Sequence, residues 1–174
     1  MDTNGPIHAP LITANMSLEK EGIFASGQAF PKHYTVMTIN ITNNTNGPIH
    51  LLTAGWDLTG TSLSDFDIDA EDEQTLNLPY YRDFSSNGLT YNKRKFAPLH
   101  QQFSYATEDG LICTIDIQLT ITIGFGVLHP TLWPNWKTTI TRSGNSNSRY
   151  PATAEITDRS KDAPFSFSVD LILG

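Results

Sequence analysis

The sequence feature that most constrains the fold is a long alternating stretch at residues 113–127, CTIDIQLTITIGFGV. Every odd position in it is apolar, and every even position is polar or glycine. Because successive side chains of a β-strand point to opposite faces, this period of two predicts a strand with one buried face. Fully extended, it would span about 50 Å at roughly 3.3 Å per residue, far more than a usual strand. We expect a bend at Gly124 and Gly126, since glycine within a strand marks a bulge or a close approach.

Shorter segments elsewhere show similar strand patterns, and turn-forming sequences separate them. The predicted strands are residues 34–42, 49–54, 65–69, 76–80, 102–106, 137–141, 152–157 and 165–173. Residues 43–48 are predicted to join the first two strands as an antiparallel hairpin, and Asp109-Gly110 to lead into the central strand.

The number and spacing of these strands indicate the fold class. Roughly eight to ten short strands without a long amphipathic helix predict an all-β protein, a single antiparallel β-sandwich. Its expected bounds are residues 34–174. Residues 1–33 are expected to form an N-terminal extension that packs on or joins a sheet.

Composition excludes several classes of protein. A chain of 174 residues with 39% hydrophobic residues is long and apolar enough for one globular domain. No run approaches the ~20 apolar residues of a membrane-spanning helix. The net charge of −7 argues against nucleic acid as a partner. The N-terminus lacks the basic and apolar regions of a signal peptide, which leaves localisation open, including export without such a signal.

Catalytic and metal-binding motifs are missing from the sequence. The five histidines show no metal-ligand spacing, and neither HExxH nor GxSxG occurs. We therefore expect no enzymatic activity, no cofactor and no metal. The single cysteine, Cys113, lies on the apolar face of the long strand and is predicted to be a small core residue.

An acidic run at residues 65–73 begins like a calcium-binding EF-hand loop. Its sixth position is Ala70 in place of glycine, and its twelfth is Leu76 in place of glutamate. The alternation of Phe66 and Ile68 with the acids favours a solvent-facing strand over the alternative of a cation site.

A first candidate site combines aromatic and basic side chains within residues 79–100. Its residues are Tyr80, Tyr81, Tyr91, Lys93, Arg94 and Lys95. A basic triplet in an acidic chain suits contact with phosphate headgroups, and tyrosine suits an interface that is half wet. The alternative is a solvated loop.

A second candidate site is the segment LHPTLWPNW at residues 128–136, with Trp133 and Trp136. Prolines on both sides of Trp133 are expected to keep this segment out of regular strand pairing. Tryptophans on a loop stack on a sugar ring, hold a choline group by cation–π attraction, or lie at a membrane interface. The alternative is that one or both close the end of the sandwich.

Residues 38–56, TINITNNTNGPIHLLTAGW, resemble the opening of the aegerolysins, small β-sandwich proteins with an Asn-Asn-Thr turn between two strands. The apolar strand and Pro/Trp loop at 125–136 add to this resemblance. The closing strand FSVDLILG and the tryptophan loop also resemble the actinoporin-like fungal fruit-body lectins. The aegerolysin resemblance implies binding of membrane lipids, sometimes with a recruited pore-forming partner. The lectin resemblance implies binding of glycans. The N-terminal segment and residues 79–100 depart from the aegerolysin pattern.

The expected function is non-enzymatic recognition of a membrane lipid surface, as a cytolysin or toxin component, because the aromatic residues are accompanied by basic ones. The first alternative is a lectin for cell-surface glycans, with Asp83, Asn87 and Asn135 as polar contacts beside a stacking aromatic. The second is a structural or self-assembling protein that uses its sheet edges. A protein partner or a homo-oligomer is compatible with these functions.

Overall fold

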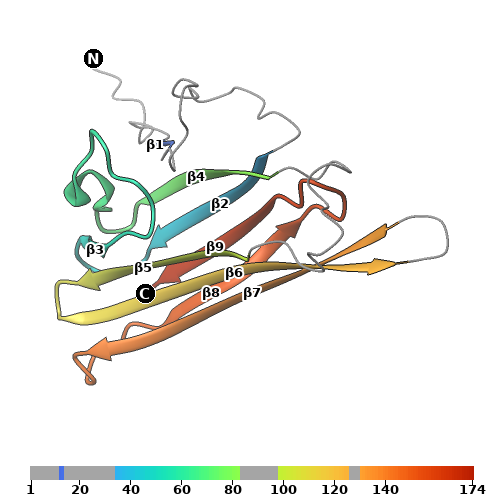
Figure 1. Ribbon diagram of the computed structural model, residues 1–174. Coiled ribbons are helices and arrows are strands. Elements are labelled where there is room, and N and C mark those ends of the chain that lie inside the picture. The colour runs from blue at the N-terminus through green and yellow to red at the C-terminus, as the bar shows by residue number, and fades with distance from the viewer. Residues whose placement is uncertain (1–11, 14–33, 83–97, 126–129) are drawn as a thin grey trace, which may run out of the picture.

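The computed structural model describes residues 12–13, 34–82, 98–125 and 130–174. These residues form two facing β-sheets (Figure 1), which confirms the predicted all-β sandwich. One sheet has the strand order β1-β4-β2-β9-β8 and the other β3-β5-β6-β7. The elements are β1 (Ile12–Thr13), β2 (Tyr34–Asn43), β3 (Ile49–Thr53), the 3₁₀ helix η1 (Leu63–Phe66), β4 (Glu73–Tyr81), β5 (Leu99–Thr107), β6 (Leu111–Phe125), β7 (Pro130–Gly144), β8 (Ala152–Arg159) and β9 (Phe167–Leu173).

The core lies between the two sheets and follows the predicted alternation. In β6 the odd residues from Leu111 to Ile121 are buried, and in β9 the odd residues from Phe167 to Leu173 are buried against them. Cys113 is one of these core residues, and burial raises the pKa of its thiol. Most strand pairs are antiparallel, but β9 runs parallel to β2, and β1 runs parallel to β4 through Ile12 and Leu76.

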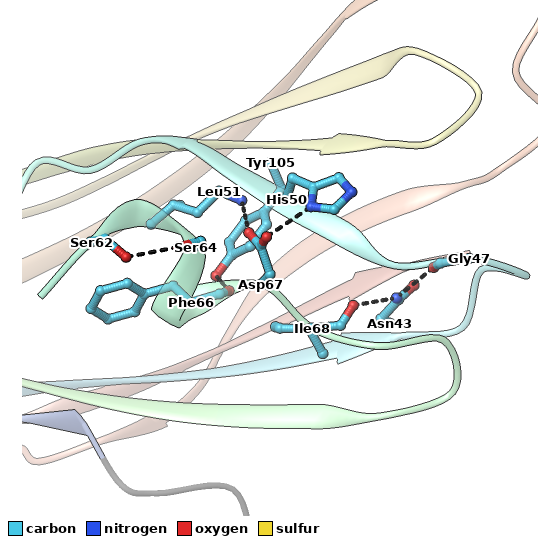
Figure 2. Close-up of polar contacts among 10 residues, drawn as sticks. All are labelled: Asn43, Gly47, His50, Leu51, Ser62, Ser64, Phe66, Asp67, Ile68 and Tyr105. Carbon is cyan, nitrogen blue, oxygen red and sulfur yellow. Dashed lines mark hydrogen bonds and ion pairs between the residues drawn. The ribbon is translucent and has the colours of Figure 1, made fainter.

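The predicted hairpin over residues 34–54 is wrong. β2 pairs with β4 and β9, whereas β3 pairs with β5 in the opposite sheet. The buried side chain of Asn43 stabilises the corner between them (Figure 2): its Nδ2 donates to the carbonyl oxygens of Gly47 at 2.9 Å and Ile68 at 3.0 Å. The same Nδ2 is also 2.9 Å from the carbonyl oxygen of Asp69. Residues 43–48 therefore connect the two sheets. The Asn43 side chain fixes this connection through its hydrogen bonds to residues 68–69.

The acidic run does not form the predicted strand. Residues Leu63–Phe66 form η1, and Ile68 makes an isolated bridge with Ile49. Phe66 and Ile68 are nevertheless buried, as expected from their apolar character. The hydroxyl of Tyr105 donates to the Phe66 carbonyl at 3.0 Å and anchors this segment to the core (Figure 2).

The same segment covers the outer edge of β3. The backbone amides of Ile49 and Ile68 donate to each other's carbonyl oxygens at 2.9 and 3.0 Å. The amide of Leu51 donates to Asp67 Oδ1 at 3.0 Å, and Asp67 Oδ2 lies 2.8 Å from His50 Nδ1 (Figure 2). The edge of β3 is thus hydrogen-bonded to protein and closed to a further strand.

The prediction that prolines keep residues 130–136 out of regular pairing is also wrong. They belong to β7, whose register with β6 runs without a shift from Leu111↔Gly144 to Phe125↔Pro130. The amide of Asn145 donates to the Gly110 carbonyl at 2.9 Å, so by alternation the odd residues of β7 direct their backbone groups toward β6. Pro134 is an even residue, and its missing N–H would point away from the sheet. Proline is tolerated at such a position of an edge strand.

Candidate functional site

The paired ends of β6 and β7 extend beyond the other strands (Figure 1). Burial falls along β6 at this point: Ile121 is 1% exposed, whereas Ile123, the next residue on the same face, is only half-buried. Ile123 pairs with Leu132, which is also half-buried. Leu132 still packs against the margin of the core, so the hairpin carries half-buried apolar side chains beyond Ile121.

Trp133 lies on the outer face of this projecting hairpin and is 61% exposed. It pairs with Thr122, and its indole lies over Gly124, where a Cβ atom would be 2.9 Å from Nε1. Gly124 is a close approach between the two strands, since any side chain there would displace the indole. The register of β6 with β7 shows no bulge at Gly124, where a bend was predicted. The strand pairing continues past Gly124, and the second predicted glycine, Gly126, lies outside the described residues.

Tyr81 is the second strongly exposed aromatic residue, at 60%. It ends β4 opposite Tyr34, the first residue of β2, and the two rings meet edge to face at 5.6 Å between centroids. β4 ends and β7 begins toward the same end of the sandwich (Figure 1). We call this end, with Tyr81, Ile123, Leu132 and Trp133, the aromatic end.

Tyr80 and Arg82 are less accessible than Tyr81. Tyr80 packs against the core, and burial raises the pKa of its hydroxyl well above the ordinary value of 10.0, against the opposing effects of Gln101 and Arg82. Arg82 is half-buried, and burial lowers the pKa of its guanidinium group. Of the two adjacent tyrosines proposed from the sequence, Tyr81 is the one that presents its ring to solvent.

Trp136 does not share a surface with Trp133, although the sequence grouped them. The three-residue spacing places them on opposite faces of β7. Trp136 is half-buried toward β8, with the guanidinium of Arg159 6.0 Å from its ring centroid. Its Nε1 is buried without a hydrogen-bond partner among the described residues. It lines a groove of about 420 Å³ between β7 and β8, together with Thr138, Ala154 and Ile156.

The remaining candidate residues, Tyr91, Lys93, Arg94 and Lys95, lie outside the described residues, as do Asp83 and Asn87. Asn135 is exposed on the same face of β7 as Trp133. The candidate sites predicted from the sequence do not include Ile123 and Leu132, whose half-buried side chains lie at this end. Extending the alternation of the central strand through residues 131–141 would have indicated them, and would have separated Trp133 from Trp136.

Two carboxylates of the acidic run are already bonded within the protein. Asp67 contacts His50 and the Leu51 amide, and Asp65 Oδ2 accepts from the Ser62 amide at 2.8 Å. Within the described ranges, no group of three or more His, Cys, Asp or Glu side chains is placed to hold a metal ion. These ranges also contain no helix that is long and apolar enough to cross a membrane.

The fold and this geometry define a β-sandwich protein with exposed aromatic residues at one end. Comparisons with protein-family models, with curated proteins and with solved structures find no match.

Proposed function

We propose that the protein recognises a membrane lipid surface through its aromatic end, without catalysis. The observation that carries this proposal is the projecting hairpin, which exposes the ring of Trp133 and leaves Ile123 and Leu132 half-buried, Leu132 at the margin of the core. Burying such side chains among headgroups and acyl chains would recover hydrophobic free energy of about 25 cal/mol per Å² of apolar surface. The indole and phenol rings of Trp133 and Tyr81 suit the boundary between water and hydrocarbon.

The position of the exposed apolar residues supports this choice. The four large hydrophobic residues exposed among the described ones are Leu52, Tyr81, Trp133 and Ile172. Leu52 and Ile172 are 41% and 40% exposed, and both lie nearer the other end of the sandwich. The two most exposed members of the set are both aromatic and lie toward one end of the sandwich, Trp133 on the outer face of β7 and Tyr81 on the outer face of β4 in the other sheet. The resemblance to aegerolysins favours the same function.

Liposome co-sedimentation tests the proposal. Vesicles of phosphatidylcholine alone and of phosphatidylcholine with phosphatidylserine are compared for the native chain and for a Trp133→Ala/Tyr81→Ala variant. We expect the double variant to lose sedimentation and keep its melting temperature. The matched control is Leu52→Ala/Ile172→Ala, which removes similar exposed apolar surface elsewhere and should bind like the native chain. Undiminished binding of the Trp133→Ala/Tyr81→Ala variant would contradict the proposal.

The basic triplet at residues 93–95 has a separate role in the proposal. If these residues contact anionic headgroups, each contributes about 1 kcal/mol that salt screens over a Debye length of about 10 Å at 0.1 M. Replacing Lys93, Arg94 and Lys95 by glutamine should weaken binding mainly to phosphatidylserine vesicles at low salt. Equal loss on both vesicle types would contradict an electrostatic role.

Glycan recognition is the second candidate, and one observation favours it. The exposed ring of Trp133 shares the polar outer face of β7 with the exposed side chains of Thr131 and Asn135. A sugar ring stacked on an indole needs such polar neighbours to fix its hydroxyl groups. A glycan array with the native chain and a Trp133→Ala variant tests this alternative. A Trp133-dependent array signal without liposome binding would favour the lectin function.

A further inference from the structure

The groove between β7 and β8 lies along one side of the sandwich, where the last strands of the two sheets meet. On the inner faces of these strands it is lined by Trp136 and Thr138 of β7 and by Ala154 and Ile156 of β8, all of them half-buried. The small side chain of Ala154 leaves space beside the indole. Its volume of about 420 Å³ is within the range of small-molecule sites.

A β-bulge in β8 decides which charged residue reaches this groove. At the bulge two residues of β8, Thr157 and Asp158, lie opposite one residue of β9. Arg159 is thereby paired with Phe167, which is buried in the core, so Arg159 belongs to the inner face. In a regular register Asp158 would pair with Phe167, and Arg159 would face outward. Bulges in natural sheets often re-aim a side chain beside a functional site. This bulge places a cation on the inner face in place of a carboxylate.

The guanidinium group of Arg159 lies over the indole of Trp136, 6.0 Å from the ring centroid. One of its nitrogens donates to the Ile156 carbonyl at 3.4 Å, and the group has five N–H donors in all. Arg159 is exposed and forms no ion pair with a carboxylate of the described residues. Lys137 and Glu155 also line the groove, but strand alternation directs their side chains to the outer faces. The inner face of the groove therefore carries one uncompensated positive charge.

We propose that this groove binds a fatty acid, with its carboxylate on Arg159 and its alkyl chain along Trp136, Ala154 and Ile156. A guanidinium group presents its donors in a planar fork that matches a carboxylate. The apolar lining beside the charge suits an alkyl chain, whose burial is favourable in proportion to its apolar area. The volume lies in the lower part of the range of roughly 300–1,000 Å³ for small-molecule sites, which suits one chain more than the two chains of a phospholipid.

The proposal goes beyond membrane recognition and is independent of it. It uses none of the residues of the aromatic end, and it requires no bilayer.

Isothermal titration calorimetry of the native chain tests the charge of the ligand. The probes are octanoate, octanol and octylamine, which share one alkyl chain, at concentrations below micelle formation. Octanoate should bind at one site per chain, octanol about tenfold more weakly because it lacks the charge, and octylamine not at all. A native chain that gives no saturable signal with octanoate, or that binds the three probes equally, would overturn the inference. Tighter binding of octyl phosphate than of octanoate would contradict the assignment to a fatty acid.

Arg159→Gln tests the proposed carboxylate contact. The variant should bind octanoate about tenfold more weakly than the native chain and should bind octanol with unchanged affinity, because only the charged hydrogen bonds are lost. Arg149→Gln is the matched control, since it removes the same charge from the exposed connection between β7 and β8 and should bind octanoate like the native chain. Native octanoate affinity in Arg159→Gln would refute the role of Arg159.

Ala154→Leu tests the site of the alkyl chain. A leucine at this position should fill the groove and abolish binding of octanoate and octanol alike, with folding checked by the melting temperature. Ala154→Val is the second variant if the leucine prevents folding, and it should weaken both ligands. Native affinity for octanoate in a folded variant with either substitution would place the ligand elsewhere and refute the inference.

Failure of this inference is distinguishable from failure of the membrane proposal. Arg159→Gln should still sediment with liposomes, whereas Trp133→Ala/Tyr81→Ala should fail to sediment and still bind octanoate. Loss of octanoate binding in a folded Trp133→Ala/Tyr81→Ala variant would show that the fatty acid binds at the aromatic end, which contradicts the inference.

Discussion

The indole Nε1 of Trp133 lies 2.9 Å from the position that a Cβ atom would occupy on Gly124. This contact joins a glycine of β6 to the most exposed aromatic side chain among the described residues. The orientation of the candidate lipid-binding tryptophan therefore depends on a residue without a side chain.

Gly124→Val should change the orientation of Trp133 with little effect on stability. A valine at this position must displace the indole, whereas substitutions on such a surface usually change the free energy of unfolding by about 0.5 kcal/mol or less. We expect a shifted tryptophan fluorescence spectrum and weaker liposome sedimentation. Thr120→Val, on the same face of β6, is the control and should leave both unchanged. Native binding by a variant with a displaced indole would argue that ring orientation is unimportant.

Asn43→Ala should be strongly destabilising. The Asn43 amide donates to the carbonyls of Gly47, Ile68 and Asp69, and its Oδ1 accepts from the Thr45 amide at 3.0 Å. Leaving several buried groups without partners should cost about 3–5 kcal/mol of the free energy of unfolding, measured by urea denaturation. Asn44→Ala, at the exposed neighbouring position, should cost far less. Similar losses in the two variants would contradict the role of the Asn43 corner.

Ile117→Asp should prevent or severely weaken folding, because Ile117 is fully buried and its replacement would place an unpaired charge in the core. We expect a loss above about 4 kcal/mol, among the largest that single substitutions cause. Gln118→Lys is the control on the opposite face, where a lysine stays near Asp116 and solvent. Comparing the melting temperatures of the two variants checks which face of β6 is buried. Equal melting temperatures would refute this assignment.

Tyr105→Phe should lower the free energy of unfolding at neutral pH. It should also reduce the loss of stability at alkaline pH. The variant loses the bond to the Phe66 carbonyl, at a cost of about 1–3 kcal/mol. Burial raises the pKa of Tyr105 well above 10.0, so the folded chain holds this proton more tightly than the unfolded chain. The stability that this difference contributes is complete below pH 10 and is lost as pH rises above it.

Denaturation between about pH 9 and pH 11 checks this prediction. The native chain should lose stability over this range, and Tyr105→Phe should lose less. Burial also raises the pKa of Tyr80, so part of the decrease in stability with pH should remain in the Tyr105→Phe variant. A native curve that is flat or rises over this range would contradict the assignment.

Calcium should not change the melting temperature. Asp65 and Asp67, which hold the first and third positions of the EF-hand-like run, already bond to the Ser62 amide, His50 and the Leu51 amide. A ligand that binds only the folded state must stabilise it by RT ln(1 + [L]/Kd). Melting curves in calcium and in chelator check this. A rise that grows with calcium concentration would establish a cation site.

The amino-acid sequence by itself determined the fold class and the buried faces. The alternation in residues 113–127 and 165–173 is a local property, because neighbouring side chains on a strand point to opposite faces whatever the strand pairs with. It correctly indicated that Ile115, Ile117 and Val169 are core residues. The turn at Asp109-Gly110 was also predicted, since the three-residue connection 108–110 depends on its own backbone angles, including the positive φ of 85° at Gly110.

Only the tertiary structure decided which strands share a sheet and which side chains share a surface. The corner at Asn43 depends on carbonyl groups of Ile68 and Asp69, about 25 positions along the chain. Pro134 is compatible with regular pairing only because β7 is an edge strand and the backbone groups of its even residues point away from β6. Both properties follow from the order of strands in the sheet. That pairing separates Trp133 from Trp136 and places Trp133 at the same end as Tyr81. Which distant strands pair depends on how the whole core packs, so a local sequence pattern does not predict it.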